Sequence, residues 1–246
     1  MASPPKPPLD DIAQALGARG PAVAGGPAAS RIYADLRQRI IDLELKPDTT
    51  IARQELARGY GASQTPVREA LQLLEQDGLV RVHPQSRTVV ARISAHQLHE
   101  THFLRVALET EVVRQLAGAR DTAASDRARS LVRMQQTLLG DPAQMGLFLD
   151  LDRAFHAGLF EAVGMQGLHA LMLRRQGHLA RCQRLELPRA GKMVEIVTAH
   201  AAIVEAIAAG DPDAAARAMR AHVTGTINRV AALQAEFPDY FEPAPA

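Results

Sequence analysis

Cysteine, tryptophan and long apolar runs are scarce or missing in this sequence. The 246 residues include one cysteine, Cys182, and no tryptophan. A single cysteine cannot form an internal disulfide, so we expect a cytoplasmic protein in which Cys182 is a packing residue. No apolar run approaches the ~20 residues of a membrane-spanning helix, and no signal-peptide pattern opens the chain. The sequence therefore indicates neither a membrane nor a secreted protein.

A surplus of charge of one sign is also lacking. The chain has 28 Lys and Arg against 27 Asp and Glu, which gives a net charge of +1. A protein that coats nucleic acid by charge alone would be far more basic, whereas a specific binder needs only a few placed contacts. Arg greatly outnumbers Lys, and its planar guanidinium suits bidentate contacts to guanine or phosphate. A genome biased toward Arg codons would produce the same ratio.

Residues 63–80 (SQTPVREALQLLEQDGLV) are the most informative segment of the chain. Apolar residues recur in it at helical spacing and predict a buried face: Val67, Ala70, Leu71 and Leu74. Polar residues lie off that stripe and predict an exposed face: Gln64, Thr65, Arg68 and Gln72. Ser63 can cap the first turn, and Gly78 ends the helix.

The surrounding sequence extends this helix into a larger motif. A shorter helix around residues 54–57 and a turn at 59–61 precede it, and residues 79–93 alternate like a hairpin with a loop at 83–88. Helix, turn, helix and hairpin are the outline of a winged helix-turn-helix, whose second helix enters the major groove of DNA. The sequence therefore predicts binding to double-stranded DNA.

The rest of the chain predicts a mainly α protein in four parts. Residues 1–29 read as a disordered arm, 30–93 as the winged helix-turn-helix, 94–236 as an all-helical bundle and 237–246 as a loose tail. In the first helix Ser30 is the expected cap, and Ile32, Leu36, Ile40 and Ile41 mark the apolar face. Six helices are expected in the bundle, over 95–118, 122–139, 142–163, 165–186, 190–209 and 212–235.

A set of acidic and imidazole side chains in the bundle could hold a metal ion. Asp152 and His156 are four residues apart, which places both on one face of a helix. His200 and His222 lie in two later predicted helices, so the four could converge in the bundle core. Taken singly, each histidine is better read as a hydrogen-bonded core residue. Together they suit a borderline divalent ion, Zn first, with Ni, Mn, Co or Fe as alternatives.

From about Ser30 to Leu233, the chain resembles the GntR family of bacterial transcription regulators, in its FadR-like subfamily with an all-helical FCD ligand-binding domain. The most specific pieces are TPVREAL at 65–71, LLEQDGL at 73–79 and the Asp and His set. The resemblance implies a homodimer on a palindromic operator. It also implies that a small carboxylic acid, bound in the bundle, acts as effector.

The resemblance also implies which residues read DNA. Arg68 matches an Arg that contacts a guanine edge or phosphate, and Thr65 matches a hydroxyl that contacts the backbone. Gln54 and Gln64 stand where the family often has Arg, and the wing tip, Ser86-Arg87-Thr88, lacks the usual glycine. The expected DNA-contacting set is Gln54, Ser63, Gln64, Thr65, Arg68 and Arg87. The alternative for Arg68 is a surface pair with Glu75 or Glu69.

In the family, Asp-x3-His and two later His form a metal site, which here gives Asp152, His156, His200 and His222. Arg105 matches a position that reaches the cavity and pairs with acid groups of the ligand, and its alternative is an intrahelical pair with Glu109.

Two further groups of basic side chains read as solvated helix faces. The first comprises His96, His99 and His102, with a place near the ligand pocket as the alternative for His102. The second is a stripe of Arg174, Arg175, His178, Arg181 and Arg184, in which Arg181 is the one candidate for an inward anion clamp.

The expected function is that of a ligand-responsive repressor rather than an enzyme. One competing hypothesis is a metal-dependent hydrolase or lyase fused to a DNA-binding module, which would need a general base beyond the metal ligands. The other is a DNA-binding dimer whose metal is purely structural.

Overall fold

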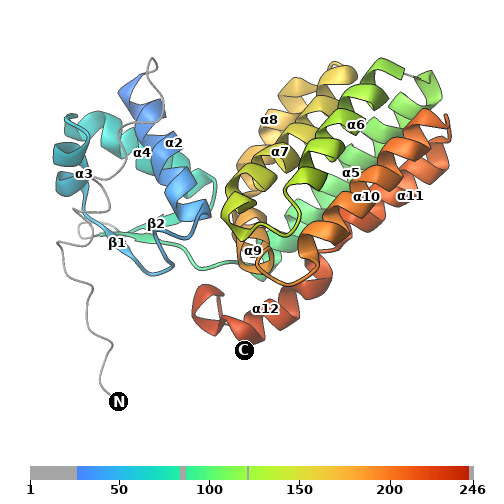
Figure 1. The fold of residues 1–246 in the computed structure, drawn as a ribbon. Helices are drawn as coiled ribbons and strands as arrows, with labels where there is room; N and C mark the ends of the chain where they lie inside the picture. Colours follow the sequence, from blue (N-terminus) through green and yellow to red (C-terminus); the bar gives the residue numbers. More distant parts are fainter. Residues whose placement is uncertain (1–26, 84–86, 121, 244–246) are drawn as a thin grey trace. The chain divides into compact units, whose positions relative to one another are not determined.

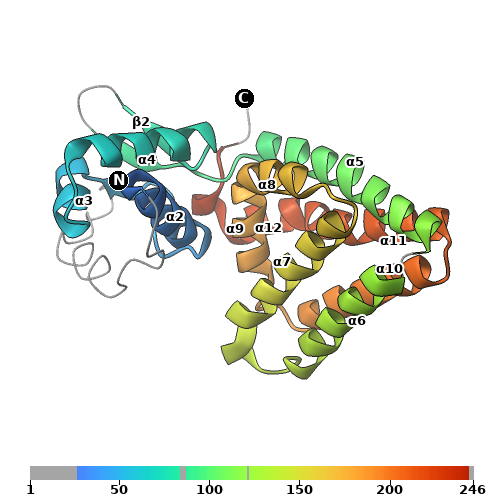
Figure 2. The same ribbon diagram turned by 90° about the horizontal axis from the view of Figure 1, so that it is seen from above.

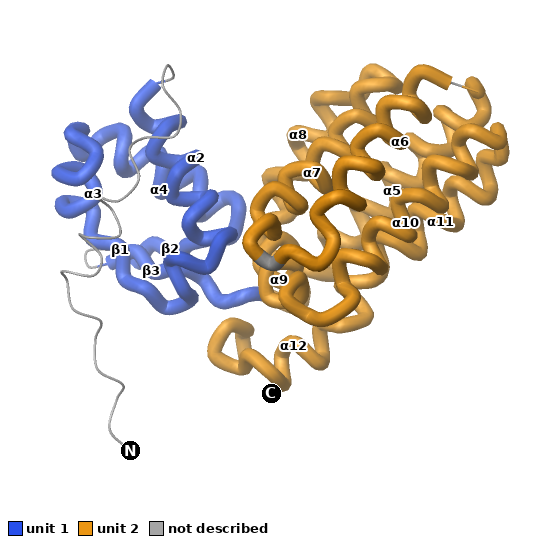
Figure 3. Tube along the Cα trace, in the orientation of Figure 1, with its two compact units in different colours: residues 1–93 blue, residues 94–246 orange. Residues whose placement is uncertain are grey.

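The computed structural model describes residues 27–83, 87–120 and 122–243. The chain divides into two compact units, which join in the sequence between Ile93 and Ser94 (Figure 3). The mainly helical architecture expected from the sequence is confirmed. Of the arm expected over 1–29, residues 1–26 lie outside the described residues.

The first unit is a winged helix-turn-helix, as predicted (Figure 1). Its elements are α2 (Ala28–Ile41), β1 (Thr50–Ile51), α3 (Arg53–Gly59), α4 (Gln64–Gln76), β2 (Val80–Val82) and β3 (Thr88–Val90). The strands form an antiparallel sheet in the order β1-β3-β2, with Val80 opposite Val90. The two-residue strand β1 was not expected, because so short a segment has no recognisable alternation.

The predicted apolar face of α4 forms the centre of this unit. Its four apolar residues, Val67, Ala70, Leu71 and Leu74, are buried and share one core with Leu36 and Ile40 of α2. Gly78 adopts φ +75° directly after the helix, a conformation that glycine tolerates best. Glu75 then accepts a hydrogen bond from the Val82 backbone N–H at 2.8 Å, which ties α4 to the wing.

One capping expectation in this unit is wrong, and another is met in position but not in hydrogen bonding. The first helix begins at Ala28 with Pro27 at its N-cap, so Ser30 lies inside the first turn. Ser63 does stand at the N-cap of α4, but its side chain accepts no capping hydrogen bond. Its hydroxyl is therefore exposed at the start of the helix.

The second unit is a bundle of helices (Figures 1 and 2). Its longer helices are α5 (Ala95–Ala119), α6 (Thr122–Thr137), α7 (Met145–Ala162), α10 (Lys192–Ala208) and α11 (Pro212–Thr224). Its shorter elements are η1 (Pro142–Gln144), α8 (Gln166–Arg175), α9 (Gly177–Glu186), η2 (Ile227–Arg229), α12 (Val230–Glu236) and η3 (Pro238–Tyr240). Helix α5 packs against α7, α10 and α11, and α6 packs against α7 and α10. None of the helices among the described residues combines the length and apolarity needed to cross a bilayer.

Two of the six expected helices are each divided. The one expected over 165–186 breaks between α8 and α9, and the one expected over 212–235 ends at Thr224, before η2 and α12. At the first break, His178 Nδ1 accepts a hydrogen bond at 3.0 Å from the backbone N–H of Ser94, and Thr101 donates to the Arg175 carbonyl at 3.0 Å. These contacts with the start of α5 are tertiary, so helical periodicity could not reveal the break.

The C-terminal segment also differs from expectation. The tail expected to be loose contains η3 over Pro238–Tyr240, and Phe241 after it is buried. Burial of the Phe241 ring contributes to holding this segment in place.

We predict that Leu74→Ala lowers the free energy of unfolding of the first unit by about 2–5 kcal/mol, because it removes a fully buried side chain between α4 and its neighbours. Denaturant unfolding of the full chain, followed by circular dichroism, measures the change. Gln72→Ala on the exposed face of the same helix is the control and should shift stability by no more than about 0.5 kcal/mol. Equal effects of the two substitutions would contradict this description of the core.

Candidate functional site

Four side chains expected to hold a metal ion converge in the second unit. Asp152 and His156 lie on α7, His200 on α10 and His222 on α11. One ligand atom from each lies within 4.8 Å of all the others. His222 Nε2 is 3.2 Å from both His156 Nε2 and His200 Nε2, and His200 Nε2 is 3.5 Å from Asp152 Oδ1. The two side chains four residues apart on α7 and the two histidines from α10 and α11 thus meet at one point, as predicted.

Further polar residues orient two of these rings. His156 Nδ1 contacts the buried Glu109 carboxylate, and His200 Nδ1 lies 2.8 Å from Gln135 Oε1. Because an imidazole that donates from Nδ1 keeps the lone pair of Nε2, both rings present an acceptor nitrogen to the shared point. Phe155 stacks on the His200 ring with a centroid separation of 3.9 Å, which fixes its plane.

Electrostatics at the cluster favour neutral rings at His200 and His222 and a charged carboxylate at Glu109. Burial, followed by the neighbouring His156 ring, lowers the pKa of His200 well below its ordinary value. Burial also lowers the pKa of His222, with His200 and His156 as the next causes. At Glu109 burial opposes ionisation, but the Arg105 guanidinium and the His156 ring together hold the pKa of the carboxyl well below its ordinary value.

The ligand set fits a divalent ion. Ligand atoms about 2.0–2.1 Å from a zinc ion stand roughly 3.3 Å apart when arranged tetrahedrally, close to the separations observed here. Neutral imidazoles and a carboxylate are ligands that Zn and its neighbours accept. Carboxylate and amide partners behind the histidines are the usual second layer of such a centre. The cluster could therefore bind a metal, and the ligand types leave its identity open.

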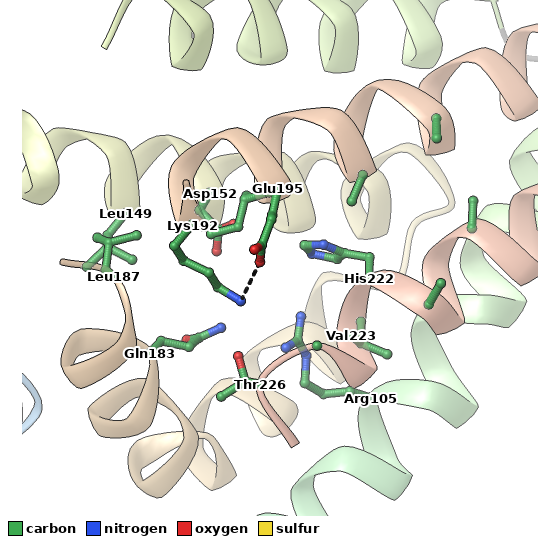
Figure 4. Close-up of a pocket in the computed structure, with 16 residues that line it drawn as sticks. Arg105, Leu149, Asp152, Gln183, Leu187, Lys192, Glu195, His222, Val223 and Thr226 are labelled. Carbon is green, nitrogen blue, oxygen red and sulfur yellow. Dashed lines mark ion pairs between the residues drawn. The ribbon is translucent and has the colours of Figure 1, made fainter. Parts of the chain in front are cut away.

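A cavity of about 320 Å³ opens beside the cluster (Figure 4). Asp152 and His222 line it, as does Arg105. Arg105 lines the cavity and also forms the intrahelical pair: its Nε donates to Glu109 Oε1 at 2.6 Å, and its Nη2 lies 3.5 Å from His156 Nε2. The guanidinium is thus held by a buried partner in the wall of the cavity.

Sequence reasoning missed several residues of this site. Glu109 was considered only as the intrahelical partner of Arg105, and Gln135 was not considered. The signal for Gln135 is its place on the buried stripe of α6, after Ala128 and Val132 at helical spacing. The cavity is also lined by Gln183, Lys192 and Thr226, and no local sequence pattern predicts this position for them.

The basic stripe over residues 174–184 is not uniformly solvent-facing. His178 and Arg181 are buried, and the Arg181 guanidinium lies 3.0 Å from His178 Nδ1. Burial lowers the pKa of Arg181 to about 10. The residue points inward, as the sequence allowed, but it is not among the described residues that line the cavity.

Cys182, His96 and His99 behave as expected, whereas His102 departs from the solvated face expected for it. Cys182 is buried, and burial raises the pKa of its thiol to about 12, which leaves it unreactive. His96 and His99 are exposed, while His102 is partly buried with its Nε2 3.0 Å from Thr224 Oγ1.

The side chains expected to contact DNA all lie on the surface of the first unit. Exposed on α3 and at the start of α4 are Gln54, Ser63, Gln64, Thr65 and Arg68. Arg68 makes no ion pair or hydrogen bond within the described part of the chain, and Glu75 is engaged by Val82 instead. Arg87 of the wing is exposed, and residues 84–86, which precede it, lie outside the described residues.

Comparison with known proteins agrees with both units. Residues 28–90 match the family model "Bacterial regulatory proteins, gntR family", and residues 100–225 match the FCD domain model. An HTH-type transcriptional regulator in an unstable DNA locus of Streptomyces ambofaciens is 35% identical over 211 residues, or 85% of this chain and 88% of the relative. The HTH-type transcriptional repressor RspR of Escherichia coli K12 is 26% identical over 215 residues, or 87% of this chain and 94% of RspR.

A solved structure shares the fold. E. coli McbR/YncC matches with a TM-score of 0.67 and 20% identity, over 87% of this chain and all of that chain. The chain therefore belongs to the GntR family, in the FadR-like subfamily with an FCD domain, and is a transcriptional regulator rather than an enzyme.

Proposed function

We propose that this chain is a ligand-responsive repressor that binds a palindromic operator as a homodimer. A small organic acid, bound at a divalent metal ion in the helical unit, controls its affinity for DNA. The observation that carries the proposal is the convergence of Asp152, His156, His200 and His222 beside a cavity that Asp152, His222 and Arg105 line. Zinc is the first choice of ion, with Ni, Mn, Co or Fe as alternatives.

Charge at the cluster favours an acid as ligand. Once bound, a divalent ion supplies a Lewis-acidic centre to which a carboxylate oxygen can attach. Asp152 and Glu109 contribute two negative charges, and Arg105 contributes one positive charge. With the two charges of the ion, the sum is +1, which one carboxylate neutralises. Arg105 is held by Glu109 with its guanidinium facing the cavity, so it can donate to that carboxylate.

Repression and dimerisation rest on the family and on symmetry. RspR, which aligns along most of this chain, is named as a repressor. A two-fold dimer presents two copies of α4 to the two halves of a palindrome in cytoplasmic DNA. The exposed residues Gln54, Ser63, Gln64, Thr65, Arg68 and Arg87 are the proposed contacts. The change in operator affinity is limited by the difference between the acid's affinities for the two states of the dimer.

We predict that the tag-free protein, once reconstituted, carries about one divalent ion per chain, and that His200→Ala and His222→Gln lose it because each removes an imidazole ligand. Elemental analysis after gel filtration measures the occupancy. His99→Ala, an exposed histidine on α5, is the control and should keep the ion. Equal metal content in all four proteins, or none in the wild type, would refute the metal centre.

We predict that a carboxylic acid which binds the metal-loaded wild type changes its operator affinity by about 5–150-fold, the usual range of coupling between two sites. Arg105→Gln should weaken acid binding because the carboxylate loses its guanidinium partner. Fluorescence anisotropy on an operator selected from random DNA measures the change across a panel of acids. Thermal stabilisation by metal and by no acid would instead support a purely structural ion.

We predict that Gln64→Arg shifts the preferred base at one operator position from adenine toward guanine, since Gln pairs best with adenine and Arg with guanine. Discrimination of about 1–3 kcal/mol per bidentate contact should be visible in sequences selected from a randomised pool. Gln76→Arg adds the same charge at the other end of α4 and should leave the selected sequence unchanged. An unchanged preference in Gln64→Arg would remove residue 64 from the base-reading set.

A further inference from the structure

A second cationic group faces the cavity that Arg105 lines. Lys192 is the first residue of α10, and only 8% of it is exposed. Figure 4 shows its side chain reaching into the cavity toward Gln183 and Thr226, which also line the wall. These three residues come from α10, α9 and the segment after α11. We call them the distal group.

The carboxylates near Lys192 leave part of its bonding capacity unused. Its Nζ lies 3.1 Å from Glu186 Oε1 and 3.8 Å from Glu195 Oε2. Only the first distance is short enough for a hydrogen bond, and an ammonium group has three donors. Glu195 is also held by Arg189, whose Nη2 donates to its two carboxylate oxygens at 2.8 and 2.9 Å. At least one Lys192 donor is therefore free of a carboxylate acceptor among the described residues.

The charges around Lys192 sum to a positive value. Glu186 Oε1 has Lys192 at 3.1 Å and Arg189 and Arg229 each at 3.8 Å. With Glu195, the group contains three positive and two negative side chains, a net charge of +1. Both arginines are more than a third exposed, so water screens them, whereas Lys192 is buried against the cavity. Of these side chains only Lys192 and Glu195 line the cavity, so a ligand there meets the Lys192 ammonium beside a carboxylate that Arg189 also holds.

We propose that the distal group binds a second carboxylate, so that the effector is a dicarboxylate. This inference rests on the proposed acid-binding function. One carboxylate faces the metal centre and Arg105, and the other accepts hydrogen bonds from Lys192 Nζ, Gln183 Nε2 and Thr226 Oγ1. One carboxylate offsets the net charge of +1 at the metal centre, and the other meets the unused donors of the Lys192 ammonium. The cavity of about 320 Å³ equals roughly ten water volumes, enough for a diacid of roughly four to six carbons.

The test compares acids that differ only in the second carboxylate. Zinc-loaded, desalted protein is titrated by calorimetry with succinate, glutarate and adipate, and with butyrate, pentanoate and hexanoate of equal chain length. Sodium sulfate controls for ionic strength. The wild type should bind at least one diacid about tenfold more tightly than its matched monoacid, the gain expected from a charge-assisted contact. In Lys192→Met that preference should fall to within about threefold, while monoacid affinity is unchanged.

Two variants guard against a loss caused by misfolding. Lys192→Arg keeps the positive charge and should retain part of the preference for diacids. Lys46→Met makes the same substitution at an exposed lysine of the first unit and should behave as wild type. Metal content measured in each variant shows whether the centre is intact.

The outcomes separate this inference from the proposed function. If the wild type binds monoacids and diacids equally, or if Lys192→Met keeps the preference, the distal group does not read a second carboxylate and acid sensing still stands. A preference for the hydroxyl-ended 4-hydroxybutyrate over succinate likewise overturns the dicarboxylate assignment. If no acid of either series binds the zinc-loaded wild type, both proposals fail together.

Discussion

The buried carboxylate of Glu109 is the interaction on which the helical unit depends. It lies on α5 between Arg105 of the same helix and His156 of α7, and all three side chains are buried. Without Glu109, a guanidinium would be buried without an anion, and His156 would lose the partner that fixes its tautomer. Removing one member of such a buried group costs far more than a surface pair contributes. The same carboxylate therefore stabilises the packing of α5 on α7 and orients His156 so that its Nε2 points to the Asp and His cluster.

A polar residue on an apolar helix stripe also supports His200, and it too is explained by the contact that it makes with an imidazole. Gln135 lies on the buried stripe of α6 and contacts His200 Nδ1, while Phe155 covers the His200 ring. Such residues weaken the hydrophobic core in which they lie, so their presence needs a compensating contact. Here the compensation is an imidazole held in one orientation. The same buried residues therefore pack the core and orient the His200 ring.

The sequence predicted the parts of this arrangement that periodicity and spacing encode. The buried and exposed faces of α4 follow from spacing alone, and so does the placement of Asp152 and His156 on one side of α7. The break between α8 and α9 could not be predicted, because it depends on contacts with the start of α5. Lys192 escaped notice for the same reason: a lysine that begins a helix usually faces water, and here the neighbouring elements bury it.

The position of α9 shows how a ligand in the cavity can bear on the rest of the unit. Gln183 and Leu187, at the end of this segment, line the cavity, while His178 near its start holds the backbone N–H of Ser94, where the second unit begins. A ligand shifts an equilibrium only through contacts that differ between its states. An acid confined to the part of the cavity lined by Arg105, Asp152 and His222 would contact α5, α7 and α11. An acid that also reached Gln183 would contact α9, the helix whose His178 accepts the Ser94 N–H, so in the proposed function its second polar group extends its contacts to a further helix of the unit.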